Sequence, residues 1–152
     1  METTEKSVEV LNDLIEINND RIAGFERASK DLEGSDGDLL AIFENMIRES
    51  RSNVQELTTA INQVGGQAET GTSGTGAIHR TWLDVKATFT GHDRKSILSE
   101  CERGEDAIKK AYKSALTNDN DLSADQTQLV AKQQKGIVSA HDKIKALRDS
   151  QA

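Results

Sequence analysis

The sequence contains no proline, and aromatic residues make up only 3% of its 152 positions. Proline interrupts helices and aromatic side chains are enriched in β-strands, so both shortages favour helices over sheets. Glu, Lys, Ala and Leu, which are strong helix formers, are plentiful. A chain of this length forms one domain of ordinary size. We therefore expect a single all-α domain covering residues 1–152.

Clusters of basic residues and long apolar runs are also missing. The formal net charge is −7, whereas nucleic acids and anionic membranes attract clustered Lys or Arg. The longest apolar run, LLAIF at residues 39–43, is far shorter than the roughly 20 residues that span a bilayer. The N-terminal METTEKSVEV lacks the apolar stretch after a basic start that marks a secretory signal. We expect no nucleic-acid partner, no membrane association and a cytoplasmic location.

Cysteine occurs once, as Cys101. One cysteine cannot form an internal disulfide, which agrees with a reducing compartment. Cys101 falls on the inward side of a predicted helix, and no sequence neighbour clearly lowers the pKa of its thiol. We therefore expect it to pack as a small apolar residue. The sequence also has no Ser-His-Asp order, CxxC pair, HExxH motif or dinucleotide fingerprint.

Apolar residues recur at intervals of three and four along four segments, a spacing typical of amphipathic helices. The spacing predicts helices over about residues 4–33, 36–64, 93–117 and 122–149. Gly65 and Gly66 end the second pattern, and Ser123 with Gln126 forms the sequence signature of a capping box at the start of the fourth. Helices of about 25–30 residues are roughly 40 Å long, which matches the proportions of a four-helix bundle.

A glycine-rich stretch, GGQAETGTSGTGAIHRTW at residues 65–82, follows the second helix. Residues 66–73 have the spacing of a P-loop, but Thr72 stands where a lysine must contact the phosphates. A helix rather than a strand also precedes them. We therefore interpret residues 65–92 as a connector that contains a short helix at about 76–90 and buries Trp82. The outer side of that helix would present a surface for a partner, made of His79, Arg80, Asp84 and Lys86.

The phrases GAIHRTWLDVKATFTG and ECERGEDAIKKAYKSAL, together with the four long helices, resemble a bacterial family of uncharacterised ferritin-like four-helix-bundle proteins. The resemblance covers almost the whole chain. Its most specific parts are His79-Arg80-x-Trp82, the ERGE of residues 102–105 and the AHD of residues 140–142. It implies a ferritin-like bundle with a short extra helix between the second and third long helices. It leaves the activity open, because what the family does is not established.

Many ferritin-like bundles hold two iron or manganese ions, so we compared this sequence with the ligand pattern of such a centre. Such a centre uses one Glu from each of two helices and a Glu-x-x-His from each of the other two. Here Val138 lies three residues before His141, and no glutamate follows Glu105. We therefore expect neither a standard di-iron centre nor a bound cofactor. The alternative is a single weaker site for iron or manganese, with ligands drawn from His141, Glu105, Glu102 and Glu16.

Polar residues interrupt the apolar sides of the predicted helices near their middles. They would form a polar layer across the bundle, made of Asn18, Ser50, Glu105 and the pair Gln133 and Gln134. An unpartnered buried polar group costs about 1–3 kcal/mol, so we expect these groups to bond one another or Arg51. We interpret the layer as setting helix register, as a core Asn does in coiled coils. A small-ligand pocket is the alternative.

These features favour a non-catalytic bundle that acts as an interaction or stress-associated protein. The alternative is a metal-binding protein based on carboxylates and histidine, acting as an oxidase or in iron handling. Apolar residues beside the main apolar sides would be exposed and would favour a homo-oligomer, namely Leu14, Ile17, Ile42 and Met46.

Overall fold

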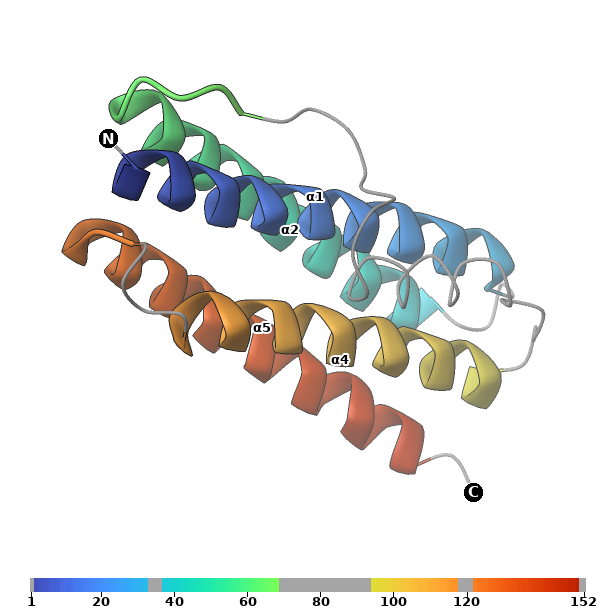
Figure 1. The fold of residues 1–152 in the computed structure, drawn as a ribbon. Coiled ribbons are helices and arrows are strands. Elements are labelled where there is room, and N and C mark those ends of the chain that lie inside the picture. The colour runs from blue at the N-terminus through green and yellow to red at the C-terminus, as the bar shows by residue number, and fades with distance from the viewer. Residues whose placement is uncertain (1, 33–36, 69–93, 118–121, 151–152) are drawn as a thin grey trace.

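The computed structural model describes residues 2–32, 37–68, 94–117 and 122–150 (Figure 1). They form four helices, α1 (Glu2–Asp31), α2 (Gly37–Gln63), α4 (Arg94–Thr117) and α5 (Ala124–Asp149), and no strand occurs in these ranges. Each helix begins and ends within two residues of its predicted position. The predicted short helix at about 76–90 and Trp82 lie outside the described residues.

The four helices pack as a bundle in which each helix contacts two neighbours. α1 packs against α2 and α4, and α5 packs against α4 and α2. Hydrogen bonds join Asn18 to Tyr112 and Arg21 to Glu105, so α1 and α4 run in opposite directions. Because α2 is also antiparallel to α1, α2 and α4 run parallel (Figure 1). The end of α2 and the start of α4 therefore lie at opposite ends of the bundle, a point that the sequence alone left open.

Two predicted helix ends have the expected local geometry. Gly65 has a φ of 78°, and the N–H groups of Gly65 and Gly66 donate to the carbonyls of Asn62 and Ile61 at 3.1 and 3.0 Å. This is the paired bonding of a Schellman motif, in which glycine supplies the left-handed residue. At the start of α5, the capping box is confirmed, since Ser123 and Gln126 each bond the other's backbone N–H.

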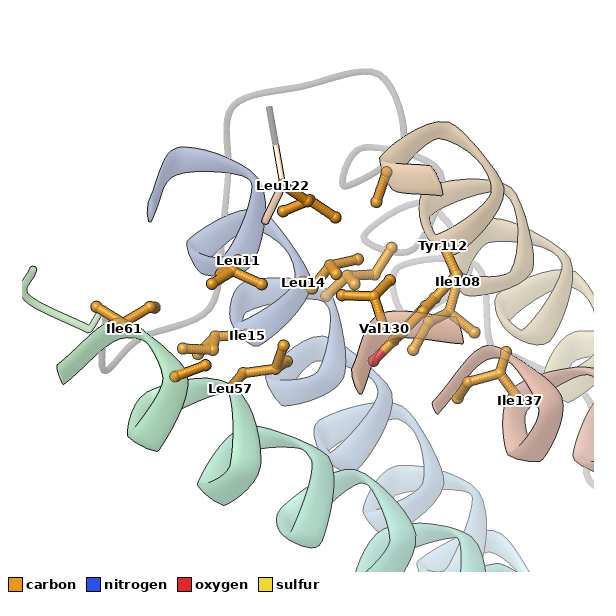
Figure 2. Close-up of a cluster of buried hydrophobic side chains, with 13 residues drawn as sticks. Leu11, Leu14, Ile15, Leu57, Ile61, Ile108, Tyr112, Leu122, Val130 and Ile137 are labelled. Carbon is orange, nitrogen blue, oxygen red and sulfur yellow. The ribbon is translucent and has the colours of Figure 1, made fainter. Parts of the chain in front are cut away.

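The apolar core consists of two clusters. The first, near the N-terminal half of α1, is shown in Figure 2 and includes Leu11, Ile15, Leu57, Ile61, Ile108, Tyr112 and Val130. The second lies toward the other end of the bundle and includes Phe25, Leu39, Phe43, Ile97, Cys101 and Ile144. The rings of Phe25 and Phe43 are 5.2 Å apart between centroids. Between the two clusters lies a layer of polar side chains.

The prediction of exposed apolar residues beside the main apolar sides was wrong. Leu14, Ile17 and Met46 are buried, and Ile42 is partly buried. The reason is geometric: a helix that contacts two neighbours buries a wider sector than the narrow stripe used for the prediction. Among the described residues, no helix is both long and apolar enough to cross a membrane.

Candidate metal centre

The predicted polar layer at mid-height is confirmed for its members Asn18, Ser50, Glu105 and Gln133. Its cation is Arg21 instead of Arg51, and the partly buried Gln134 forms none of the layer's hydrogen bonds. Arg21 is fully buried and binds Glu105 through two parallel contacts, Nε to Oε1 at 2.7 Å and Nη2 to Oε2 at 3.0 Å. Its Nη1 donates to Oε1 of Glu49 at 2.8 Å and to Oγ of Ser50 at 2.9 Å. Arg51 is exposed on α2. Arg21 reaches the layer because it lies three residues after Asn18, on the same side of α1.

Amides and hydroxyls complete the polar layer. The Nδ2 of Asn18 donates to the Tyr112 hydroxyl at 2.9 Å, and its Oδ1 accepts from Ser50 and Asn53. The Tyr112 hydroxyl donates to Oε1 of Gln133 at 2.7 Å. The Gln133 amide in turn donates to Glu56 at 3.1 Å. Tyr112 was not predicted from the sequence to belong to this layer. Burial raises the pKa of its hydroxyl above the usual value of 10.

The sequence lacks a di-metal pattern, and the ion pairs of Arg21 agree with that absence. In di-iron bundles, inward carboxylates of several helices converge on two cations. Here Glu49 and Glu105 converge on a guanidinium, which already supplies a fixed positive charge in the interior. Burial raises the pKa of the Glu105 carboxyl, and the ion pair with Arg21 opposes that shift. Glu105 is therefore committed to the polar layer and is poorly suited to bind a metal ion.

A different cluster lies between α4 and α5, and it contains two of the residues that the sequence nominated. Glu102 and Asp106 are four residues apart on α4, and His141 projects from α5. Each offers one potential ligand atom, and these atoms lie within 4.8 Å of one another. Glu105 and Glu16 do not belong to this group. Asp106 was not nominated, because the di-metal pattern used for comparison is built from glutamates, although its i, i+4 spacing from Glu102 is visible in the sequence.

The environment of His141 suits a metal ligand. The residue is 6% exposed. Its Nδ1 lies 3.1 Å from Oδ1 of Asp142, and its Nε2 lies 2.6 Å from Oδ1 of Asp106. The second contact lacks the direction of a hydrogen bond, so Nε2 has no hydrogen-bond partner. In the tautomer with the proton on Nδ1, His141 donates to Asp142, and the lone pair on Nε2 faces the carboxylates.

The two carboxylates differ in exposure and in their partners. The side chain of Glu102 is 11% exposed, whereas that of Asp106 is 50% exposed, so the cluster is open to solvent on one side. The Nη1 of Arg148 contacts Oε2 of Glu102. Arg148 also binds Asp149, with Nη2 at 2.8 Å from Oδ1.

Cys101 precedes Glu102 but points elsewhere. It packs in the second apolar cluster, as predicted, and burial raises the pKa of its thiol well above the usual value. The predicted partner surface of the connector, made of His79, Arg80, Asp84 and Lys86, lies outside the described residues.

The four helices and their packing form a ferritin-like four-helix bundle. Comparison with solved structures agrees: a mutant of Dps1 from Mycobacterium smegmatis superposes with a TM-score of 0.85 at 14% sequence identity, over 97% of each chain. Residues 6–118 match a family described as a domain of unknown function, DUF2383, and the chain belongs to that family. No match was found among curated proteins.

Proposed function

We propose that the protein binds one divalent transition-metal ion at Glu102, Asp106 and His141, as a non-catalytic metal-handling bundle. The observation that carries this proposal is the buried His141, whose Nε2 lacks a hydrogen-bond partner and faces two carboxylates. A buried polar atom that makes no hydrogen bond is costly, and the 2.6 Å approach of Nε2 to Oδ1 of Asp106 is an ion pair only when the ring is protonated. A metal ion at this position would satisfy Nε2 and neutralise both carboxylates.

The residues around the cluster support a metal ligand set. A histidine that binds a metal usually donates its other ring N–H to a carboxylate or carbonyl, which fixes its tautomer and orientation. Asp142 is placed to accept that hydrogen bond. One imidazole and two carboxylates suit manganese, iron and zinc better than the softest or hardest ions. Two carboxylates also balance the charge of a divalent cation.

Three protein ligands favour reversible binding of a single ion. They leave coordination positions free for water, unlike closed structural sites with four protein ligands. The half-exposed Asp106 gives an ion a direct route from solvent. Two of the carboxylates at mid-height, Glu49 and Glu105, are already ion-paired with Arg21. These features support metal handling over the two-metal chemistry of an oxidase.

Titration of tag-free protein with Mn²⁺, and separately with Zn²⁺, tests this proposal. We expect one ion per chain by calorimetry. Asp106→Asn and His141→Gln should each weaken binding by at least about tenfold, because even second-sphere changes have effects of that size. Glu44→Gln, which changes an exposed carboxylate on α2, is the matched control and should leave affinity unchanged. Absence of binding to the wild type, or equal affinity in all variants, would contradict the proposal.

An interaction or stress-associated activity, a homo-oligomer and a cytoplasmic location remain predictions from the sequence. The argument for an oligomer has lost its original basis, because most of the apolar residues on which it rested are buried in the core.

A further inference from the structure

Arg148 holds one of the carboxylates that the proposed metal ion needs. It lies seven residues after His141, so both side chains project from the same side of α5, two turns apart. Its Nη1 contacts Oε2 of Glu102, and its Nε and Nη2 donate to Oδ1 of Asp149 at 3.2 and 2.8 Å. Glu102 is therefore paired with a cation when no metal is bound.

We propose that Arg148 is a built-in competitor of the metal ion, which displaces it from Glu102 on binding; this inference rests on the proposed function of the cluster. A divalent ion bound by Glu102 places two positive charges beside the guanidinium, and like charges at such short range repel. The ion also withdraws electron density from the carboxylate that Arg148 contacts. Metal binding and the Arg148–Glu102 contact therefore oppose each other.

The surroundings of Arg148 make its release easy. Two of its donor nitrogens are already bound to Asp149, which is not part of the cluster. The side chain is 30% exposed, so water can accept a hydrogen bond from Nη1 after Glu102 is withdrawn. Release leaves neither a buried donor nor an isolated charge. It does remove a contact between the last turn of α5 and α4, so metal occupancy is communicated to the end of the helix.

The alternative is that Arg148 orients Glu102 for the metal, as outer-sphere partners often do. The two possibilities predict opposite effects of removing the guanidinium. An orienting residue strengthens metal binding, and its loss weakens affinity. A competing residue weakens metal binding, and its loss strengthens affinity.

Calorimetric titration of Mn²⁺ into wild type, Arg148→Gln and Lys145→Gln tests the inference. We expect Arg148→Gln to bind Mn²⁺ about fivefold more tightly than the wild type, the scale of a partly exposed ion pair. Lys145→Gln removes the same charge one turn earlier, from an exposed residue that does not contact Glu102 in any described interaction. It should change affinity by less than about twofold. Arg148 lies in the last turn of α5, so both variants should fold, which thermal unfolding checks.

A second measurement follows Arg148 itself. The Nε–H resonance of Arg148 should shift when Zn²⁺, which is diamagnetic, is added to the wild type, and it should not shift in Asp106→Asn. Unchanged or weaker Mn²⁺ affinity in Arg148→Gln, or an equal gain in Lys145→Gln, would overturn the inference while leaving the metal site intact. Absence of binding in all three proteins would instead refute the proposed function and this inference with it.

Discussion

Arg21 on α1 and Glu105 on α4 form a two-contact ion pair in the middle of the bundle, where both side chains are fully buried. The planar guanidinium matches the carboxylate and makes this geometry specific. The pair lies between two apolar clusters, so a shift of α1 along α4 by one turn would place two charges among aliphatic side chains. We infer that the pair fixes helix register, as was expected of the polar layer.

Removing one partner of this pair should be strongly destabilising. Glu105→Gln leaves Arg21 with Glu49 as its only charged partner in the described layer. Breaking a buried ion pair typically costs 3–5 kcal/mol. Because Glu49 remains, we expect the free energy of unfolding to fall by about 3 kcal/mol in urea denaturation. A variant as stable as the wild type would show that the pair is not needed for the fold.

The double variant Arg21→Met, Glu105→Leu provides the control for this result. Replacing a buried pair with apolar residues of similar volume is often neutral or stabilising. Glu49 is 33% exposed and can turn toward water when Arg21 is removed. We therefore expect the double variant to be more stable than Glu105→Gln. Less cooperative unfolding would accompany the gain if the pair specifies register.

Gly136 on α5 makes room for Glu49. A Cβ at Gly136 would lie 2.9 Å from Oε2 of Glu49, closer than normal packing permits. Gly→Ala inside a helix is normally stabilising by about 1 kcal/mol. Here the substitution must displace a carboxylate that binds Arg21, and a hydrogen bond to a charged group contributes about 1.5–3 kcal/mol. We expect Gly136→Ala to be neutral or destabilising in thermal and urea unfolding.

Gly136→Ala made together with Glu49→Ala isolates the effect of the close contact between residue 136 and the Glu49 carboxylate. Without the carboxylate, Gly136→Ala should regain the usual stabilisation of about 1 kcal/mol relative to Glu49→Ala alone. A full stabilisation by Gly136→Ala in the wild-type background would mean that Glu49 moves aside freely.

Tyr112 is the only tyrosine of the chain, so its ionisation can be followed directly. Burial raises the pKa of its hydroxyl in the folded state above the unfolded value of 10. Between these two values the folded state binds more protons than the unfolded state, so stability must decrease as pH rises above about 10. Phenolate absorbance should therefore appear at higher pH in native protein than in urea. Tyr112→Phe should reduce the loss of stability above pH 10, and identical slopes would contradict the assignment.

Apolar periodicity was sufficient to predict the helices, because one buried side per helix repeats every three to four residues. It could not predict which polar residues meet, since that depends on which helices are neighbours and at what height. Asn18 and Glu105 were correctly placed in the polar layer. Their cation was misassigned to Arg51, although Arg21 lies three residues after Asn18 and therefore on the same side of the helix.

The candidate metal centre was likewise predictable only in part from the sequence. His141 and Glu102 were nominated as ligands of one site together with Glu105 and Glu16, and the packing of α4 against α5 brings only the first two together. Asp106 could have been found from its spacing to Glu102 on one side of α4. Arg148 could not, because its contact with Glu102 depends on the antiparallel register of α4 and α5.

Cys101 and Glu102 are adjacent in sequence yet lie in different environments. Successive residues of a helix project about 100° apart, so Cys101 packs among Phe25 and Ile97 while Glu102 faces α5. The thiolate is the reactive form, and burial both raises the thiol pKa and blocks access to the sulfur. We expect Ellman's reagent to react with this only cysteine at least about a thousandfold more slowly in native protein than in urea, since global opening is rare.

The same reaction, repeated with Mn²⁺, tests whether Cys101 contributes to the metal site. Mn²⁺ should slow the reaction by stabilising the folded state, whereas direct thiolate binding would protect the sulfur even in urea. A native rate within about tenfold of the unfolded rate would show that α4 opens locally beside the cluster.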